Sequence, residues 1–302
     1  MSSPIAEPMD AFRGDRTYLG ADHRRNERRT WIVATICLIL LAAQISGGLA
    51  FGSMALVANG LHMAAHVAVL VVAALAYGLA RSFANDPRFA FGTGKIGYLA
   101  GFANAAVLAL TALLVVLESL HRLIAPEPVA YEGAMGLAAG VLAISLLCVW
   151  LLRPGPASET DEDLNLSAAH LHLAGDAGVS LLALMGLAAG RYLGWTWADP
   201  VAGMLGAGLL GHFSWRLLRR AGAVLLDLNP SPKLTAEIRA RLEQGGDQVL
   251  DLHLWRLGPG HHAAIVVVGS LEPGPVEAYH ARLDGMGGLR HVTIEVRQRR
   301  GA

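Results

Sequence analysis

The chain has 302 residues, of which 54% are hydrophobic and 16% are charged, and its mean hydropathy is +0.44. Soluble domains carry about 25% charged residues, so this composition excludes an ordinary soluble protein and is typical of a polytopic protein in a lipid bilayer. Lys and Arg total 24, as do Asp and Glu, and this balance predicts no nucleic-acid partner.

The N-terminal segment, residues 1–30, is polar and ends in the basic run RRNERR at residues 24–29. We expect this segment to be flexible and cytoplasmic, because positive charges that flank a first span stay inside. The 50 residues from 31 to 80 contain no Asp, Glu, Lys or Arg. Since one span takes ~20 residues, this run predicts two transmembrane helices.

Four further apolar segments follow, at about residues 96–117, 133–152, 164–189 and 200–218. Basic residues such as Arg81, Lys95 and Arg219 flank them on the side that carries the N-terminus. The pattern therefore predicts an α-helical membrane domain of six transmembrane helices over residues 31–226, with both termini in the cytoplasm.

Residues 227–302 have a different texture. Segments 230–244 and 275–283 have helical periodicity, whereas 249–256, 263–268 and 291–297 are typical of strands. The order helix–strand–strand–helix–strand predicts a small cytoplasmic α+β domain. Its strands have few residues to cover them, so we expect a homodimer that forms through this domain.

Two pairs of metal-ligating residue types lie inside the apolar segments. His62 and His66 are four residues apart, as are His172 and Asp176. On a helix, this spacing places both members of a pair on one face. At 1.5 Å per residue, His66 and Asp176 each lie ~18 Å from the start of their helix, so one ion could contact both pairs. The alternative is a polar network that only packs the helices.

Three imidazoles and one carboxylate suit a borderline divalent ion such as Co(II), Ni(II) or Zn(II), and do not suit Mg(II) or Ca(II). Asn59 lies one turn before His62 and is a candidate to support the ion, with a packing hydrogen bond as the alternative. Cys37 and Cys148 form no CxxC motif, and we interpret them as packing residues.

The tail contains further histidines that could form a cytoplasmic metal site. Their spacing does not fix such a site, and surface or strand histidines are the alternative. The candidates are His253, His261, His262 and His291.

Four stretches of this sequence resemble motifs of the cation diffusion facilitator family. They are GSMAL at 52–56 leading into LHM at 61–63, FGTGK at 91–95, the pair His172 and Asp176, and DLHLW at 251–255. The resemblance implies a homodimer of six-helix subunits, each with a ferredoxin-like cytoplasmic domain. It also implies export of divalent metals in exchange for protons.

The zinc-exporting branch of that family carries HxxxD on its second and fifth helices. The fifth helix of this chain keeps the pattern, whereas His66 stands where an aspartate is expected on the second. The form NGLHMAAH at 59–66, with the FGTGK loop and a short fourth loop, resembles the cobalt/nickel-exporting branch.

We therefore expect proton-coupled efflux of divalent transition metals, chiefly Co(II) and Ni(II), from the cytoplasm across a bacterial inner membrane. Zn(II) efflux is the alternative within transport, and a membrane-anchored metal sensor is the alternative from another class. An intramembrane metalloenzyme would need a glutamate after the first histidine, where Met63 stands. We thus expect no enzymatic activity and no cofactor apart from the transported metal.

Overall fold

The computed structural model describes residues 18–20, 22–50, 54–126, 131–153 and 163–299. The chain divides into two compact units. The helical unit comprises Ala21–Leu79 and Ile96–Leu225. The mixed unit comprises Ala80–Lys95 and the chain from Leu226 onward, together with residues 18–20.

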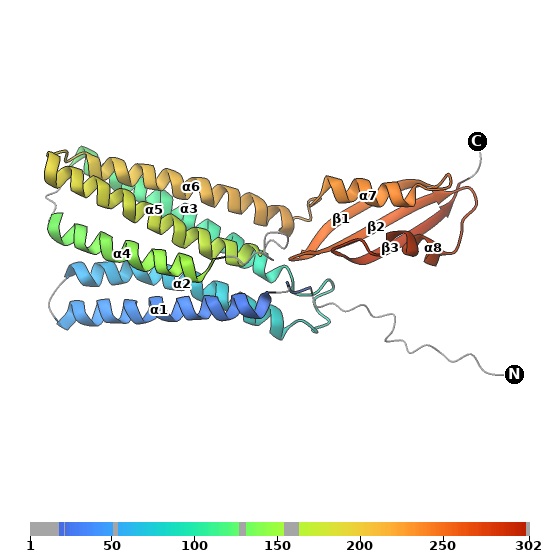
Figure 1. Cartoon of the computed structure of the whole chain (residues 1–302), viewed down its shortest axis with the longest axis horizontal. Helices are drawn as coiled ribbons and strands as arrows, with labels where there is room; N and C mark the ends of the chain where they lie inside the picture. The colour runs from blue at the N-terminus through green and yellow to red at the C-terminus, as the bar shows by residue number, and fades with distance from the viewer. Residues whose placement is uncertain (1–17, 21, 51–53, 127–130, 154–162, 300–302) are drawn as a thin grey trace. The chain divides into compact units, whose positions relative to one another are not determined.

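The helical unit consists of six long helices that run side by side (Figure 1). They are α1 His23–Ala50, α2 Met54–Ser82, α3 Ile96–Ile124, α4 Tyr131–Leu151, α5 Leu164–Leu193 and α6 Ala198–Leu225. Helix α6 packs against α3 and α5, and α5 also packs against α4 and α3. Helix α5 therefore lies between three neighbours and is the central element of the unit.

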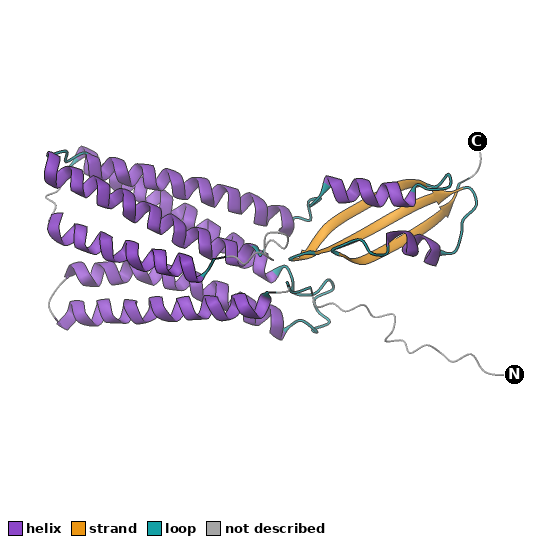
Figure 2. Ribbon diagram, in the orientation of Figure 1, coloured by secondary structure: helices purple, strands orange, loops and turns teal. Residues whose placement is uncertain are grey.

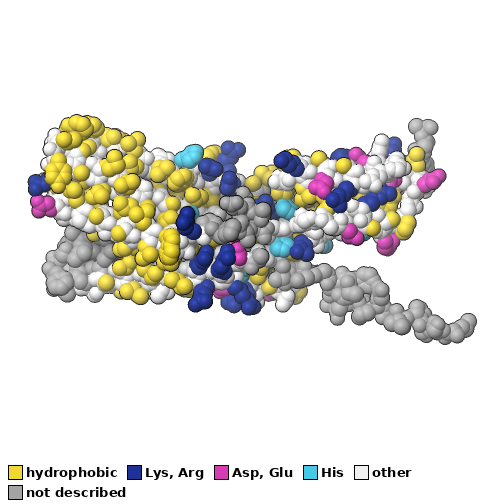
Figure 3. Space-filling view, viewed as in Figure 1, with side chains coloured by type: hydrophobic (Ala, Val, Ile, Leu, Met, Phe, Trp, Pro, Cys, Tyr) yellow, Lys and Arg dark blue, Asp and Glu magenta, His cyan; other side chains and the backbone are white. Residues whose placement is uncertain are grey.

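Within the described residues, three of these helices are long and apolar enough to cross a membrane, namely α3, α4 and α5. In α2, the described apolar stretch covers His66–Ser82. Hydrophobic side chains cover much of the visible face of the helical unit (Figure 3). On α3, Leu110, Leu113 and Leu117 are each more than half exposed, as expected for side chains that face lipid. The count of six spans stays a prediction.

The first helix differs from the sequence prediction, which treated residues 1–30 as flexible and began the first span at residue 31. Helix α1 begins at His23 and includes the whole basic run. Inside the helix, Thr30 Oγ1 donates to the Asn26 carbonyl at 2.8 Å, and both residues are buried. Arg is a good helix former, so the basic run extends the apolar helix beyond its uncharged part.

Helices α5 and α6 approach each other closely where both carry glycine. A Cβ added at Gly186 of α5 would lie 2.8 Å from Asp199 Cα and 2.9 Å from the Ala198 carbonyl oxygen. A Cβ added at Gly206 of α6 would lie 3.0 Å from a methyl group of Val179. Small residues at these crossings let the two backbones come into contact, as is common between helices in membranes.

The mixed unit contains the elements that the tail sequence predicted, in the predicted order (Figure 2). They are α7 Pro232–Leu242, β1 Gln248–Gly258, β2 His261–Ser270, α8 Val276–Leu283 and β3 Leu289–Gln298. Strand β2 lies in the middle of the sheet, antiparallel to β1 and parallel to β3. Ile238, Leu242, Val266 and Tyr279 form part of its buried core.

The loop between α2 and α3 belongs to the mixed unit, although the sequence prediction placed all of residues 31–226 in one membrane domain. The Phe91 ring lies 5.5 Å from the Trp255 ring, and Lys95 forms an ion pair with Asp227. A Cβ at Gly94 would lie 2.4 Å from the Leu257 carbonyl oxygen. The FGTGK motif thus packs against the first strand of the tail.

The close approach at Gly186 generates a stability prediction. Alanine at this position should lower the free energy of unfolding by about 1–3 kcal/mol, because its methyl group would overlap the backbone of α6. The matched control is Gly208→Ala on the exposed side of α6, where nothing lies within 4 Å of an added Cβ. Alanine there gains helix propensity of about 1 kcal/mol without a clash.

Thermal unfolding of both variants in detergent measures the difference, with a lower midpoint expected only for Gly186→Ala. Equal midpoints for the two variants would show that α5 and α6 are not in backbone contact at this crossing.

Candidate metal centre

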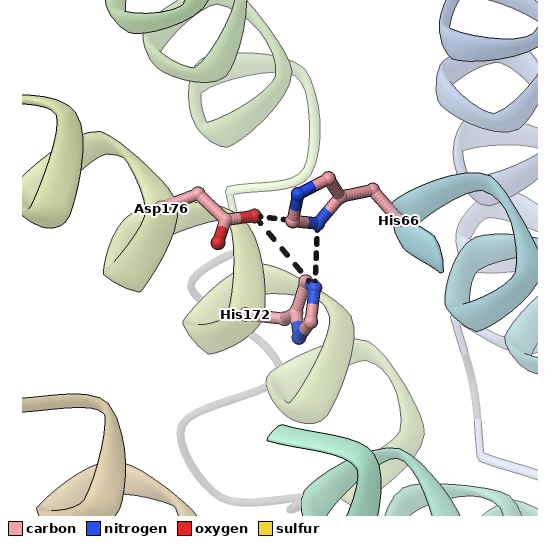
Figure 4. Close-up of side chains that lie close together, drawn as sticks. All are labelled: His66, His172 and Asp176. Carbon is pink, nitrogen blue, oxygen red and sulfur yellow. Dashed lines mark hydrogen bonds and ion pairs between the residues drawn. The ribbon is translucent and has the colours of Figure 1, made fainter. Parts of the chain in front are cut away.

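Three potential metal ligands meet in the middle of the helical unit, from helices α2 and α5 (Figure 4). His172 and Asp176 lie one turn apart on α5, and His66 reaches them from α2. The i, i+4 spacing puts the two α5 side chains on one face of the helix, as the sequence predicted. That face is directed toward His66 (Figure 4).

The ligand atoms are close enough to bind one ion. His66 Nδ1 lies 2.9 Å from His172 Nε2 and 3.0 Å from Asp176 Oδ2. His172 Nε2 lies 3.7 Å from the same carboxylate oxygen. In a tetrahedral shell with metal–ligand bonds of ~2.1 Å, neighbouring ligand atoms stand ~3.4 Å apart. The three observed separations bracket that value, so an ion can enter with small side-chain movements.

All three side chains are largely removed from solvent. His66 and His172 are 8% and 3% exposed, and the Asp176 side chain is 14% exposed. An ionised carboxylate at this depth costs at least ~2.5–3.5 kcal/mol unless a cation accompanies it. Two cations can do so here: a proton on one of the imidazoles, or a divalent metal ion between the three groups. The site can therefore alternate between protons and metal.

The start of α5 is held by a hydrogen-bond network that also fixes α2. Asp163 caps α5 and accepts from the backbone N–H groups of Asn165 and Leu166. The Tyr77 hydroxyl of α2 donates to the Asp163 carboxylate at 2.5 Å, and Asn165 Nδ2 donates to the Ala73 carbonyl of α2 at 2.8 Å. These bonds set the register of α2 against α5 and so align His66 with His172.

The sequence analysis did not single out Asp163, which ends the acidic run ETDED at residues 159–163. A carboxylate directly before an apolar helical segment is a helix N-cap signal, and this signal could have identified it. The preceding part of that run, residues 159–162, lies outside the described residues.

A cavity of ≈ 510 Å³ extends from the metal centre along α3, α5 and α6. His66 and His172 line it at one end. Glu118, Arg122 and Asp199 line it near the end of the bundle where α3 finishes and α6 begins. Glu118 accepts from Arg122 Nε at 2.8 Å and its side chain is 59% exposed. The cavity therefore connects two of the three ligands with one end of the bundle, through a mostly apolar lining that carries charged side chains at that end.

The other candidates on α2 are not placed. His62 and Asn59 belong to α2, but their side chains lie outside the described residues. The sequence predicts His62 as a fourth ligand, and Asn59 stays a candidate for contact with the ion or its ligands.

The tail histidines do not come together. His253 is exposed and pairs with Asp251 at 2.8 Å, whereas His261 Nδ1 lies 2.6 Å from the Pro259 carbonyl oxygen. The His291 ring stacks edge-on against Phe91. In the part of the chain that the structure describes, only the group of His66, His172 and Asp176 unites three or more potential ligands. His262, in β2, belongs to no such group.

Comparisons with known proteins identify the family to which this chain is similar. The family model of the cation efflux transmembrane domain matches residues 30–226. The zinc transporter ZitB of Escherichia coli is 33% identical over 242 residues, which cover 77% of this chain and 74% of that protein. The cadmium, cobalt and zinc/H(+)-K(+) antiporter of Bacillus subtilis is 28% identical over 286 residues, covering 91% of each chain. The metal cation efflux system protein CzcD of Cupriavidus metallidurans is 30% identical over 262 residues, covering 83% and 80%.

The geometry predicts that Asp176→Asn abolishes high-affinity metal binding, because it removes the one anionic ligand of the described group. Mutation of a residue that only orients a metal ligand lowers metal affinity about 10–100-fold. Removal of the ligand itself should therefore lower metal affinity by more than about 100-fold. Calorimetric titration of the purified protein with Zn²⁺ and Co²⁺ measures the loss. His212→Ala, an exposed histidine on α6, serves as the control and should bind as wild type does. An unchanged affinity in Asp176→Asn would remove this carboxylate from the site.

Proposed function

Because this chain belongs to the cation efflux family, we propose that it exports divalent transition metal ions in exchange for protons, and that the ions bind at His66, His172 and Asp176. Membership makes it a membrane protein that moves divalent metal ions out of the cell. The ions, the exchange and the residues are our proposals. The observation that carries them is the convergence of two imidazoles and one carboxylate inside an apolar bundle.

The ligand set supports borderline ions as the cargo. Imidazole and carboxylate ligands together suit Zn(II), Co(II) and Ni(II), whereas Mg(II) and Ca(II) prefer shells of oxygen alone. The relatives carry names that include zinc, cadmium and cobalt. We therefore assign Zn(II) and Co(II) to the shared cargo range, with Ni(II) included by ligand chemistry.

Exchange with protons follows from the ligands themselves. An imidazole binds metal only in its neutral form, so metal entry expels any proton that the histidines carry. Protons that return displace the metal and keep Asp176 neutralised. The name of the Bacillus subtilis relative includes H(+) and K(+) among its exchanged ions. The cavity lined by Glu118 and Asp199 is the route by which metal leaves and protons enter.

The topology that we propose places both termini in the cytoplasm of a bacterium and the bundle in its inner membrane. Basic residues support it, since Arg29 Nη1 donates to the Arg153 carbonyl at 3.1 Å and joins the ends of α1 and α4 on one side of the bundle.

A homodimer is supported by exposed apolar side chains on the mixed unit, such as Leu250 and Leu271, which a second copy would bury. Metal transport requires no cofactor, and we propose no enzymatic activity.

A narrower cargo range is the second candidate. His66 stands where the zinc-exporting branch has an aspartate, and this residue lies within bonding distance of both other ligands. Neutral nitrogen in place of anionic oxygen removes one negative charge from the site. This observation favours a preference for Co(II) and Ni(II) over Zn(II). The third possibility is a membrane-anchored sensor, and the flux measurements described next test it.

Dissipation of a pH gradient should stop metal transport into proteoliposomes, because metal ions that enter the lumen must be exchanged for protons that leave it. The measurement follows Co²⁺ and Zn²⁺ uptake with an encapsulated dye, with and without a protonophore. Liposomes that contain the Asp176→Asn variant control for leak. Metal flux that continues at full rate without a pH gradient would disprove proton exchange, and no flux under any gradient would favour the sensor.

Replacement of His66 by aspartate should shift selectivity toward zinc while export continues. The added carboxylate restores the charge that the zinc-exporting branch carries, and zinc accepts a tetrahedral shell of mixed N and O ligands. Competition between Co²⁺, Ni²⁺ and Zn²⁺ in the same vesicles should show a several-fold rise in the Zn:Co rate ratio. An unchanged ratio would show that His66 does not determine the preference.

A further inference from the structure

The two cysteines of the chain meet inside the helical unit. Cys37 belongs to α1 and Cys148 to α4, and they are 2% and 0% exposed. Both thiols are free, and both belong to one buried cluster of side chains. They lie 111 positions apart, at residues 37 and 148, so no sequence motif indicated this contact.

A third sulfur lies in the same place. Met63 of α2 is 7% exposed and belongs to the same buried cluster as both cysteines. The three sulfur-bearing side chains come from three different helices, and each of them lines one small cavity. Thiolate and thioether sulfur are the soft ligands that select soft metal ions.

The cavity has the size of a single ion. Its volume is ≈ 20 Å³, and about 10–15 Å³ is the minimum for one water molecule. Besides the sulfurs, His66, Ser145 and Asp176 line it. His66 and Asp176 are also ligands of the metal centre, so the cavity adjoins that centre directly.

We propose that Cys37 and Cys148 form a second metal site, selective for cadmium, beside the export site. Binding replaces two S–H bonds by two Cd–S bonds, and both protons leave, so one Cd²⁺ and two thiolates form a neutral unit. Neutrality matters because residual charge inside an apolar bundle is costly. A monovalent soft ion between two thiolates would leave one negative charge, so the divalent ion fits better. Met63 completes the soft shell.

The site favours softer ions than the export centre does. Nitrogen and oxygen ligands can bind Zn(II), Co(II) and Cd(II). A pair of thiolates with a thioether favours Cd(II), which is the softest of these three ions. The proposal concerns binding and does not require transport, so it can fail or succeed independently of the proposed function.

The test uses the purified full-length protein with reduced thiols and Cd²⁺ as the probe. Because the chain has only two cysteines, any thiolate-to-cadmium charge-transfer band in the ultraviolet arises from this pair. We expect the band to saturate at one Cd²⁺ per chain and X-ray absorption to show sulfur next to cadmium. Each single variant, Cys37→Ser and Cys148→Ser, should lose the band, and excess Co²⁺ should not displace the ion.

Two further variants complete the design. Ser145 lines the same cavity and carries no sulfur, so the Ser145→Ala variant should keep the band. This variant controls for the effect of changing the cavity lining as such. His172→Ala disrupts the export centre but does not line this cavity, so it should also keep the band. A wild-type protein without the band at saturating Cd²⁺ would overturn the proposal, as would a band that survives in either cysteine variant. Zn²⁺ binding by the cysteine variants shows that they are folded.

Discussion

The structure depends on one carboxylate, Asp176, buried among apolar helices. Its charge requires a cation at the middle of the bundle, and among the described residues its partners His66 and His172 can each accept a proton or share a metal ion. Two histidines provide both possibilities, because a neutral imidazole is a ligand and a protonated one is a counter-ion. In the exchange that we propose, metal binding and proton binding both satisfy this single electrostatic requirement.

Helix α5 carries this carboxylate and therefore must be placed accurately. At one end, Asp163 caps the helix and binds Tyr77, so that α2 cannot slide along α5 without breaking these bonds. Further along, Gly186 lets α6 approach within backbone contact. Between these two attachments lie His172 and Asp176. The ≈ 510 Å³ cavity extends from the centre toward the end of the bundle where α3 finishes and α6 begins.

The sulfur cluster extends the chemistry of the centre beyond nitrogen and oxygen. His66 and Asp176 each line the small cavity beside Cys37 and Cys148. These two residues therefore belong both to the nitrogen and oxygen ligands of the metal centre and to the lining of the sulfur cavity. Such proximity is a consequence of packing four helices around one point. It places ligands of different softness within reach of one entering ion, and selectivity then depends on which shell the ion prefers.

The sequence by itself determined the local features of this protein. It predicted that His172 and Asp176 share a helix face, because a spacing of four residues has that result on any α-helix. It also predicted the order of elements in the tail, because alternation and helical periodicity are local patterns. The tertiary structure decided which distant residues meet: His66 with His172, Cys37 with Cys148, and the FGTGK loop with β1. These contacts depend on how side chains of different helices interdigitate and on the register that Asp163 and the glycines impose. Both are set by packing between segments far apart in the chain, which no local pattern encodes.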